Sequence, residues 1–166
     1  MSAWAQITTA LADEFALPDP GAMAVIVARL LTAAILGGLV GYERERKGRA
    51  AGLKTHILVS IGSALFVLAP AMAGVPMEDI TRVMQGIVSG IGFLGAGAII
   101  KMEKDTRVEG LTTAAGVFMT SAIGMSAGVG MEIVALATTL VALVVVRTIP
   151  KLMPADERHR LPPRDH

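Results

Sequence analysis

Charged and polar residues inside apolar stretches are the residues of this chain that could do chemistry. Arg29 interrupts the run VIVARLLTAAILGG, and we expect it to face a bundle interior and to pair with an acceptor there. An arginine in mid-membrane costs at least about 2.5–3.5 kcal/mol on insertion scales, which is the reason for that expectation. Glu132, Gln85 and backbone carbonyls freed at glycines are the acceptors that the sequence offers. Snorkelling of the side chain to the membrane surface is the alternative.

Glu43 and Arg44 lie directly after this apolar run, in GYERERKGRAAGLKTH. Basic residues are common at such a membrane edge, but an acid there is not needed for orientation. We therefore expect Glu43 to pair with Lys54 or Arg44, or to accept a cation. The charges that follow it are expected to form a solvated loop.

Lys54, Thr55 and His56 open the next apolar run, GLKTHILVSIG. A histidine one turn into a membrane can move protons or bind a metal, but a metal site needs several ligands. Since His159 and His166 both lie in the carboxyl-terminal tail, a histidine held by a neighbouring helix is the favoured interpretation. No metal site and no cofactor is expected.

The segment QGIVSGIGFLGAGAII is apolar, uncharged and rich in glycine. Its candidate residues are Gln85, Gly86, Gly90, Gly92, Gly95 and Gly97. A glycine costs about 1 kcal/mol relative to alanine inside a soluble helix, whereas small residues allow close helix contact in a bilayer. The G-x-G-x-x-G match from Gly90 to Gly95 does not indicate a dinucleotide site, because that motif needs a preceding strand. We expect this span to pack at the core, with its glycines close to Arg29, a partner helix or an ion.

Thr112 and Thr113 begin a further apolar run in GLTTAAG, where they can cap a helix or point inward. Pairs of glycines four residues apart recur at Gly37/Gly41, Gly86/Gly90 and Gly124/Gly128. These pairs exceed what one small bundle needs, which predicts self-association or another membrane partner. No nucleophile–base set and no paired carboxylates occur within an apolar run, so an enzyme is not expected.

The composition places the chain in a membrane. Of its 166 residues, 53% are hydrophobic and 17% are charged, and the mean hydropathy is +0.61. These values are too apolar for an ordinary soluble domain of this length. The chain has no cysteine, which excludes a disulfide framework and a thiolate metal site.

Five spans are predicted, each long enough for a helix to cross a hydrocarbon core of about 30 Å. They cover about residues 21–42, 54–74, 83–100, 110–127 and 130–149, with Pro70 and Pro76 ending the second and Pro150 the fifth. Sustained period-two alternation is missing, which disfavours strands. The predicted fold class is an all-α integral membrane protein, with one five-helix domain over residues 21–150.

The basic residues predict an orientation. They gather after the first, third and fifth spans, at Arg44, Arg46, Lys47, Arg49, Lys54, Lys101, Lys104, Arg107, Arg147, Lys151, Arg158, Arg160 and Arg164. The opposite side has Arg82 alone. By the positive-inside rule, the amino terminus faces out and the carboxyl terminus faces the cytoplasm.

The two ends are predicted to lie outside the membrane. Residues 1–20 contain no Lys or Arg, which argues against a secretory signal. A short interfacial helix and an unstructured segment are both compatible with this extracytoplasmic stretch. Residues 151–166 are expected to form a short disordered cytoplasmic tail, solvated or in contact with anionic lipid headgroups.

The motifs occur in the order Arg29, GYERE, GLKTHILVSIG, QGIVSGIGFLGAGAII and GLTTAAG. In this order the chain resembles the MgtC/SapB family of bacterial inner-membrane proteins, over about residues 27–149. The resemblance implies five spans with the orientation above and a link to growth under magnesium limitation. Family members are also associated with survival of pathogens in macrophages. The best-studied type is thought to act on the F-type ATP synthase and membrane potential instead of carrying magnesium.

Residues that match the family motifs are the functional candidates. They are Arg29, Glu43, Arg44, Lys54, Thr55, His56, Gln85, Gly86, Gly90, Gly92, Gly95, Gly97, Thr112 and Thr113. Lys54 stands where the family commonly has arginine, which loses bidentate geometry. Thr112 stands where virulence-type members have asparagine, so their pathogenic role is not carried over. Without the soluble carboxyl-terminal domain of the longer members, the chain looks like the short SapB-like branch.

Two functions follow as hypotheses. The first is a membrane-embedded regulator or interaction protein linked to magnesium and membrane-energy homeostasis. Its expected partners are membrane lipid and a second copy or another membrane protein, with the F-type ATP synthase as a candidate and no nucleic acid. The alternative is a small ion or solute transporter or channel, with Arg29, Glu43, His56 and Gln85 along one polar path.

Overall fold

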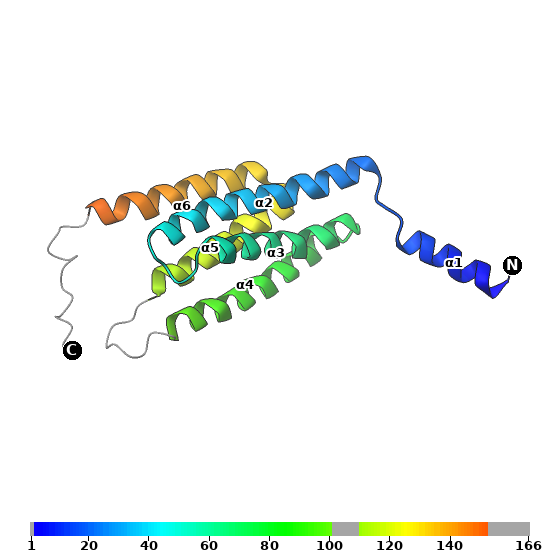
Figure 1. The fold of residues 1–166 in the computed structure, drawn as a ribbon, viewed down its shortest axis with the longest axis horizontal. Coiled ribbons are helices and arrows are strands. Elements are labelled where there is room, and N and C mark those ends of the chain that lie inside the picture. The colour runs from blue at the N-terminus through cyan, green and yellow to red at the C-terminus, as the bar shows by residue number, and fades with distance from the viewer. Residues whose placement is uncertain (1, 101–109, 153–166) are drawn as a thin grey trace.

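The computed structural model describes residues 2–100 and 110–152, and every regular element in these residues is a helix (Figure 1). The helices are α1 (Ala3–Glu14), α2 (Pro20–Arg46), α3 (Leu53–Met72), α4 (Met77–Ile100), α5 (Leu111–Gly128) and α6 (Glu132–Leu152). The all-helical prediction is thereby confirmed. The predicted loop with Lys101, Lys104 and Arg107, and nearly all of the predicted tail, lie outside the described residues.

The helix ends follow local sequence signals. Asp19 caps α2 by accepting hydrogen bonds from the next backbone amides, 2.9 Å from that of Gly21, and Pro20 occupies the first helical position. The prediction that Pro70 ends the second span is wrong, because α3 continues through it to Met72. Pro70 lies only two residues before the end of α3, so its missing backbone N–H removes a single hydrogen bond from the helix.

Four helices, α2, α3, α4 and α6, are long and apolar enough to cross a membrane. The remaining bundle helix, α5, has polar or glycine residues at several buried positions, among them Thr113, Thr120, Ser121, Gly124 and Gly128. It packs against all four of the others and lies between them (Figure 1). Its polar face is therefore covered by protein.

The prediction that the glycine-rich span packs at the core is wrong. Its helix, α4, packs against α3 and α5 only, at one side of the bundle. A Cβ added at Gly86, Gly90, Gly92 or Gly97 would meet no neighbour within 4 Å. Gly95 alone touches another helix, where an added Cβ would lie 3.4 Å from the Cβ of Ala114. The central position belongs to α5 because its glycines, and not those of α4, face a complementary surface.

Close packing in the bundle centres on α3, which lies between glycines of α2 and of α5. A Cβ added at Gly37 would lie 2.6 Å from the Cβ of Ser60, and one at Gly41 would lie 2.8 Å from that of His56. From the other side, a Cβ at Gly124 would overlap the backbone of Ser60. Glycine is required at these contacts because backbones approach more closely than any side chain allows.

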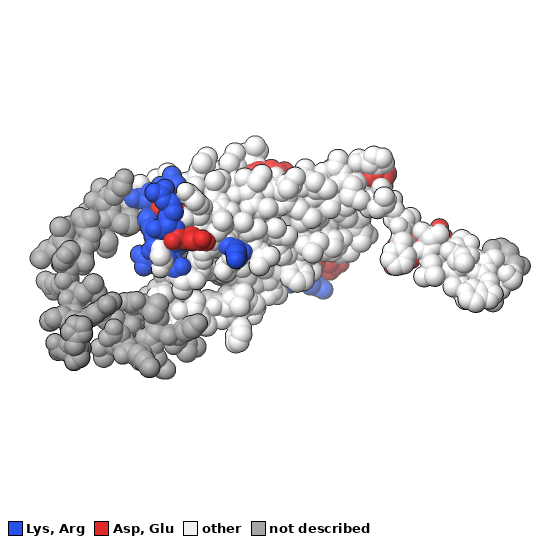
Figure 2. All heavy atoms as spheres, in the orientation of Figure 1, with Lys and Arg blue, Asp and Glu red and all other residues white. Residues whose placement is uncertain are grey.

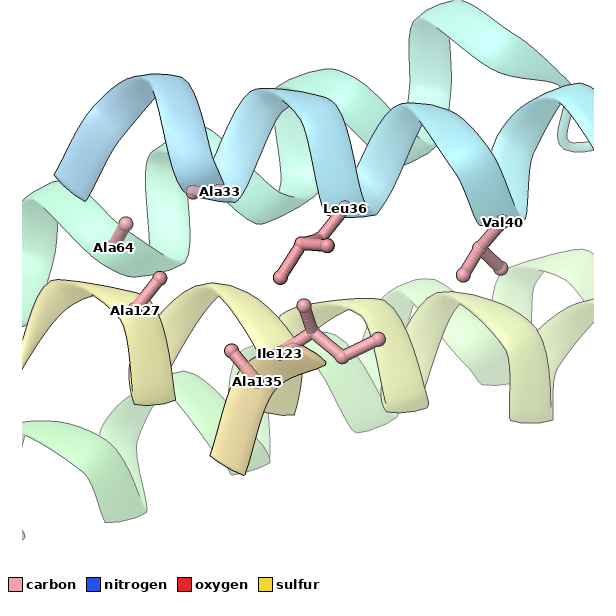
Figure 3. Close-up of a cluster of buried hydrophobic side chains, with 7 residues drawn as sticks. All are labelled: Ala33, Leu36, Val40, Ala64, Ile123, Ala127 and Ala135. Atoms are coloured by element: carbon pink, nitrogen blue, oxygen red, sulfur yellow. The ribbon is translucent and has the colours of Figure 1, made fainter. Parts of the chain in front are cut away.

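The apolar core joins α2, α3, α5 and α6. It consists of Ala33, Leu36, Val40, Ala64, Ile123, Ala127 and Ala135 (Figure 3). Alanine supplies more than half of these positions, so dispersion contacts between closely spaced backbones take the place of large interlocking side chains.

Helix α1 stands apart from the bundle and packs against none of the other described helices (Figure 1). The helical alternative for this segment is therefore the correct one. Trp4, Ile7, Leu11 and Phe15 are all exposed along it. Their spacing gives α1 an apolar stripe, which is typical of a helix lying in a membrane interface.

Lys and Arg gather at one end of the bundle, where α2 ends and α3 begins (Figure 2). This connection carries Arg44, Arg46, Lys47, Arg49 and Lys54. The opposite end is poorer in positive charge.

Candidate functional site

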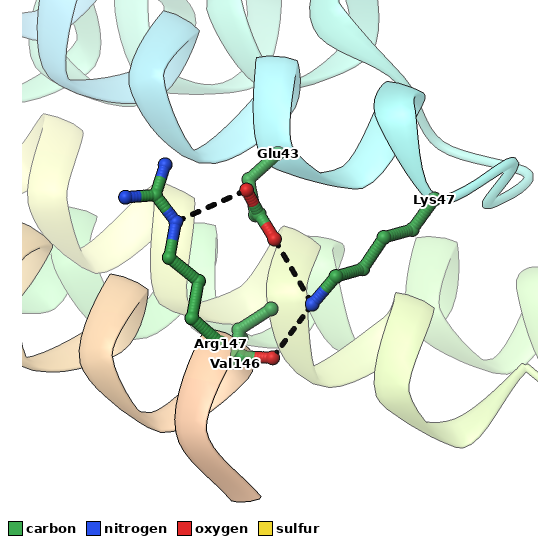
Figure 4. A network of polar contacts seen from close by, with 4 residues as sticks. All are labelled: Glu43, Lys47, Val146 and Arg147. Carbon is green, nitrogen blue, oxygen red and sulfur yellow. Dashed lines mark hydrogen bonds and ion pairs between the residues drawn. The ribbon is translucent and has the colours of Figure 1, made fainter. Parts of the chain in front are cut away.

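Glu43 is the centre of an ion-pair network between α2 and α6 (Figure 4). Its Oε1 lies 2.9 Å from Lys47 Nζ, and its Oε2 accepts a hydrogen bond of 3.1 Å from Arg147 Nε. Lys47 also donates to the carbonyl oxygen of Val146, at 2.8 Å. The prediction that Glu43 pairs with Lys54 or Arg44 is wrong. Lys47 is one helical turn away on the same face, and that face packs on α6.

This network fixes the role of the Glu43 carboxylate. The residue is 7% exposed, and each carboxylate oxygen already has a cationic partner. A carboxylate so neutralised is not free to bind a metal cation. It instead joins the ends of two helices that are far apart in the sequence.

Arg44 points the other way and is buried, with 2% of its surface exposed. Its Nε and Nη2 have no hydrogen-bond partner among the described residues. The adjacent Glu45 is engaged elsewhere, since its Oε2 accepts the backbone N–H of Leu53 at 2.6 Å. A guanidinium is always charged, and burying one without a counter-charge costs several kcal/mol.

His56 lies beside Arg44 and is fully buried. Its Nδ1 is 2.8 Å from the carbonyl oxygen of Gly52, so this nitrogen is the one that carries a proton. Its Nε2 has no partner among the described residues. A Cβ added at Gly116 of α5 would lie 3.4 Å from His56 Nε2 and 3.6 Å from Arg44 Nε, so both groups converge on one point of α5.

Buried hydroxyl groups continue from this point along the α3–α5 contact. Thr120 donates to the carbonyl oxygen of Gly116 at 2.9 Å, and the hydroxyls of Ser63 and Ser121 are 2.8 Å apart. The Oγ of Ser60 is buried without a partner in the described part of the chain. These residues were not predicted from the sequence. The available signal was the spacing of Ser60 and Ser63 on one face of an otherwise apolar helix.

Arg29 lies at the other end of the bundle, beside the turn between α5 and α6. Its Nη1 donates to the carbonyl oxygen of Gly128 at 3.1 Å, and its Nε is 3.9 Å from Oε1 of Glu132. The expected pairing with Glu132 and with a glycine carbonyl is confirmed. Arg29 sits level with the last residues of α5, and its depth in the membrane stays a prediction. There it caps a helix carboxyl terminus, where a positive charge is favourable.

An apolar groove of about 700 Å³ runs between α3 and α4. It is lined by Leu58, Val59, Gly62, Ser63, Phe66, Val83, Gly86, Ile87, Gly90, Ile91 and Leu94. Two of the glycines of the glycine-rich segment thus face this open surface.

The motifs that build these sites fall within one continuous region of the chain. The model of the family described as MgtC family matches residues 30–154. The chain belongs to the MgtC family. It is 44% identical over 117 residues to the protein MgtC of Salmonella typhimurium (strain LT2), covering 70% of this chain and 49% of that protein.

Two further relatives of this MgtC-family chain carry other names. It is 42% identical over 114 residues to protein SrpB of Synechococcus elongatus, covering 62% of this chain and 63% of that one. It is 36% identical over 136 residues to the "putative magnesium transporter YhiD" of Escherichia coli (strain K12), covering 78% of this chain and 62% of that one. The alignments thus reach less than two thirds of each relative's length. No solved structure matches the chain.

The motif candidates of this MgtC-family protein fall into separate places. Arg44, His56 and Thr113 are buried where α2, α3 and α5 meet. The exposed candidates are Lys54, Thr55, Gln85, Gly86, Gly90, Gly92, Gly97 and Thr112. The polar path through Arg29, Glu43, His56 and Gln85 does not form, because Glu43 faces α6 and Gln85 is exposed. Among the described residues, no three His, Asp or Glu side chains meet to hold a metal ion.

Proposed function

We propose that this MgtC-family chain is a non-enzymatic regulator or interaction protein of the bacterial inner membrane, linked to magnesium limitation and membrane-energy homeostasis. The family supports the magnesium link, since one relative is named as a putative magnesium transporter. The observation that carries the interaction role is the open apolar groove between α3 and α4.

The proposal includes five spans, with the amino terminus outside and the carboxyl terminus in the cytoplasm. Four helices have the required length and apolarity, and α5 runs among them with its polar face covered. Positive charge is concentrated on the connection from α2 to α3 (Figure 2). That connection is therefore assigned to the cytoplasm.

Single cysteines test this orientation cleanly because the chain has none of its own. Ala16→Cys precedes α2 and Ala50→Cys lies in the α2–α3 connection, and both positions are exposed. In cells whose outer membrane is permeabilised and whose inner membrane is sealed, a membrane-impermeant maleimide should label Ala16→Cys and should not label Ala50→Cys. The reverse pattern would refute the orientation.

The groove partner we propose is a second copy of this chain. The groove floor carries Gly86 and Gly90, while large side chains such as Phe66 and Leu94 stand exposed at its margins. In lipid, helices associate through close backbone contact at small residues, so a glycine floor beside exposed ridges suits another α4 related by two-fold symmetry. Lipid occupancy of the same groove is the competing outcome.

Disulfide cross-linking in native membranes tests the dimer. Gly90→Cys should form a covalent dimer on mild oxidation, whereas Val141→Cys, at a site on α6 that is 63% exposed, should not. A chain that stays monomeric, with no cross-link and no co-purifying protein, would refute the interaction role. Capture of F-type ATP synthase subunits by Gly90→Cys in place of a second copy would redirect it to that partner.

The magnesium link needs a test in cells. A deletion strain should grow poorly at low magnesium and show an altered membrane potential by dye uptake. The wild-type chain should restore both, and Gly90→Leu should not, because its side chain fills the groove floor. Val141→Leu is the matched control and should restore growth.

Transport is the second candidate, favoured by one specific observation. Buried polar groups extend from Arg44 and His56 past Ser60 to the Ser63–Ser121 pair, and several of them have no hydrogen-bond partner among the residues that the structure describes. Such a row is compatible with passage of an ion or small solute. Flux assays in proteoliposomes decide the matter, with His56→Gln and Ser63→Ala as variants within the row and Glu43→Gln as a control outside it. No flux of any tested ion through the wild-type chain would eliminate transport.

A further inference from the structure

Helix α6 is tied to α2 by an ion pair at each end of its apolar segment. Near the start of α6, Oε1 of Glu132 lies 3.9 Å from Nε of Arg29, and near its end Nε of Arg147 donates to Glu43 (Figure 4). The residues between these two ties, 30–42 on α2 and 133–146 on α6, carry no charge. At 1.5 Å per residue, the two charged layers are about 21 Å apart. This separation is about 9 Å less than the thickness of a hydrocarbon core of about 30 Å.

Helices α2 and α3 continue past the turn that joins α5 to α6, residues 129–131 (Figure 1). Because α2 begins at Pro20, it extends about 13 Å beyond Arg29 at 1.5 Å per residue. A Cβ added at Gly128 would overlap the carbonyl oxygen of Ala64, so the end of α5 lies beside Ala64. From there α3 continues to Met72, about 12 Å further. The α5–α6 turn is therefore a step below the ends of α2 and α3.

The α5–α6 turn is charged and partly exposed. The side chains of Arg29 and Glu132 are 22% and 45% exposed, and the neighbouring Met131 and Ile133 are exposed as well. Charged side chains within a membrane usually have water or an opposite charge beside them. A span that is shorter than the hydrocarbon core is accommodated by local thinning of the bilayer. Both effects bring water and lipid headgroups down to the turn.

We propose that phospholipid headgroups of the leaflet nearest Arg29 descend with their water onto the α5–α6 turn. In the proposed orientation this is the outer leaflet, and the membrane is thinner beside α6 than beside α2 and α3. Arg29 and Glu132 place a cation and an anion side by side, which suits the phosphate and ammonium groups of a zwitterionic headgroup. This arrangement requires the five proposed spans, but neither their orientation nor a partner in the α3–α4 groove.

Cysteine labelling in nanodiscs of dioleoylphosphatidylcholine tests whether the turn is in contact with water. A nanodisc exposes both membrane faces to an impermeant maleimide, so the result does not depend on orientation, and the chain has no cysteine of its own. Met131→Cys reports on the turn. Val27→Cys and Leu31→Cys are matched controls, because they bracket Arg29 along α2, are exposed, and lie on the opposite face of that helix. Met131→Cys should react at least about tenfold faster than either control, because the reactive thiolate forms in water.

Bilayer thickness provides a second measurement. The thermal unfolding midpoint of the wild-type chain should fall from thin dimyristoleoyl- to thick dierucoylphosphatidylcholine, because a thicker core must be thinned further at α6. Glu132→Leu lengthens the apolar segment of α6 and should lose part of this fall. Glu78→Leu is the control, since it removes an exposed acid at the start of the longer helix α4 and should keep the whole fall.

Three results would overturn the proposal. The first is a Met131→Cys thiol that reacts no faster than those of Val27→Cys and Leu31→Cys in the folded chain. Unfolding in sodium dodecyl sulfate should make all three react alike, which excludes an intrinsic difference between the thiols. The second is an unfolding midpoint that does not fall with thickness, and the third is an equal fall in Glu132→Leu and the wild type.

A wrong orientation would be recognised separately, by reversed labelling of Ala16→Cys and Ala50→Cys in cells. It would assign the thinned leaflet to the cytoplasmic face and leave the faster reaction of Met131→Cys in nanodiscs unchanged.

Discussion

Two glycine pairs with the same spacing should respond oppositely to the same substitution. Gly124 on α5 and Gly90 on α4 each have a second glycine four residues away, at 128 and 86. Replacing either residue by alanine adds one methyl group to a helix. We predict that Gly124→Ala destabilises the bundle and that Gly90→Ala does not.

The magnitude follows from what each methyl group would meet. At Gly124 the nearest atoms are the carbonyl oxygen, carbonyl carbon and Cα of Ser60, so the whole of α3 must move. Overpacking of this kind costs about 1–3 kcal/mol, and contact with backbone argues for the upper end. Alanine returns about 1 kcal/mol of helix propensity, leaving a net loss of about 2 kcal/mol. At Gly90 the added methyl group would meet no atom of another helix within 4 Å among the described residues, so only the gain of up to about 1 kcal/mol applies.

Reversible unfolding in mixed micelles, followed by far-ultraviolet circular dichroism, measures this difference. The free energies of unfolding of the two variants should differ by about 3 kcal/mol, with the wild type between them. Micelles at high detergent-to-protein ratio keep the chain monomeric, so that any contact made by Gly90 with a second copy does not contribute.

Equal stabilities for the two variants would refute the reasoning. They would mean either that α3 and α5 are not in backbone contact at Ser60 or that α4 is covered in the folded monomer. Gly128→Ala, which would overlap the backbone of Ala64, provides an internal check because it should resemble Gly124→Ala.

Three further sets of substitutions test the polar contacts. Glu43→Gln should lower the free energy of unfolding by about 1–2 kcal/mol, measured by the same unfolding assay, because two partly exposed cations lose their shared carboxylate. Ser63→Ala and Ser121→Ala should each cost about 1–2 kcal/mol, and the double variant should cost little more than either, as a double-mutant cycle will reveal. Arg29→Ala should cost about 1 kcal/mol and increase hydrogen exchange at the end of α5, whereas Arg29→Lys should retain part of the capping.

The residue types that matter were visible in the sequence, but only some of their partners were. Arg29 was marked by its charge in an apolar run, and its acceptors Glu132 and a glycine carbonyl were among those expected. Glu43 was also marked, yet its partner Arg147 lies in another helix more than one hundred residues away, and no local spacing indicates it. Local patterns specify which side chain needs a partner, whereas the topology of the bundle supplies it.

The glycine-rich segment also shows that a sequence does not reveal which helix surfaces meet. Its composition predicted close packing, but packing requires two complementary surfaces, and a sequence describes one of them at a time. The glycines of α2 and α5 found such a surface on α3, while most of those of α4 remained open. The buried hydroxyls of Ser60, Ser63 and Ser121 likewise became significant only once the helices that cover them were known.

The sequence by itself determined that this chain is a helical membrane protein of the MgtC family, since length, apolarity and motif order are properties of the chain alone. The tertiary structure decided that α5 and not α4 is central, that Glu43 joins α2 to α6, and that Arg44 and His56 converge on Gly116. The physical reason is that burial and pairing are relations between helices, and they exist only after the backbones have come together.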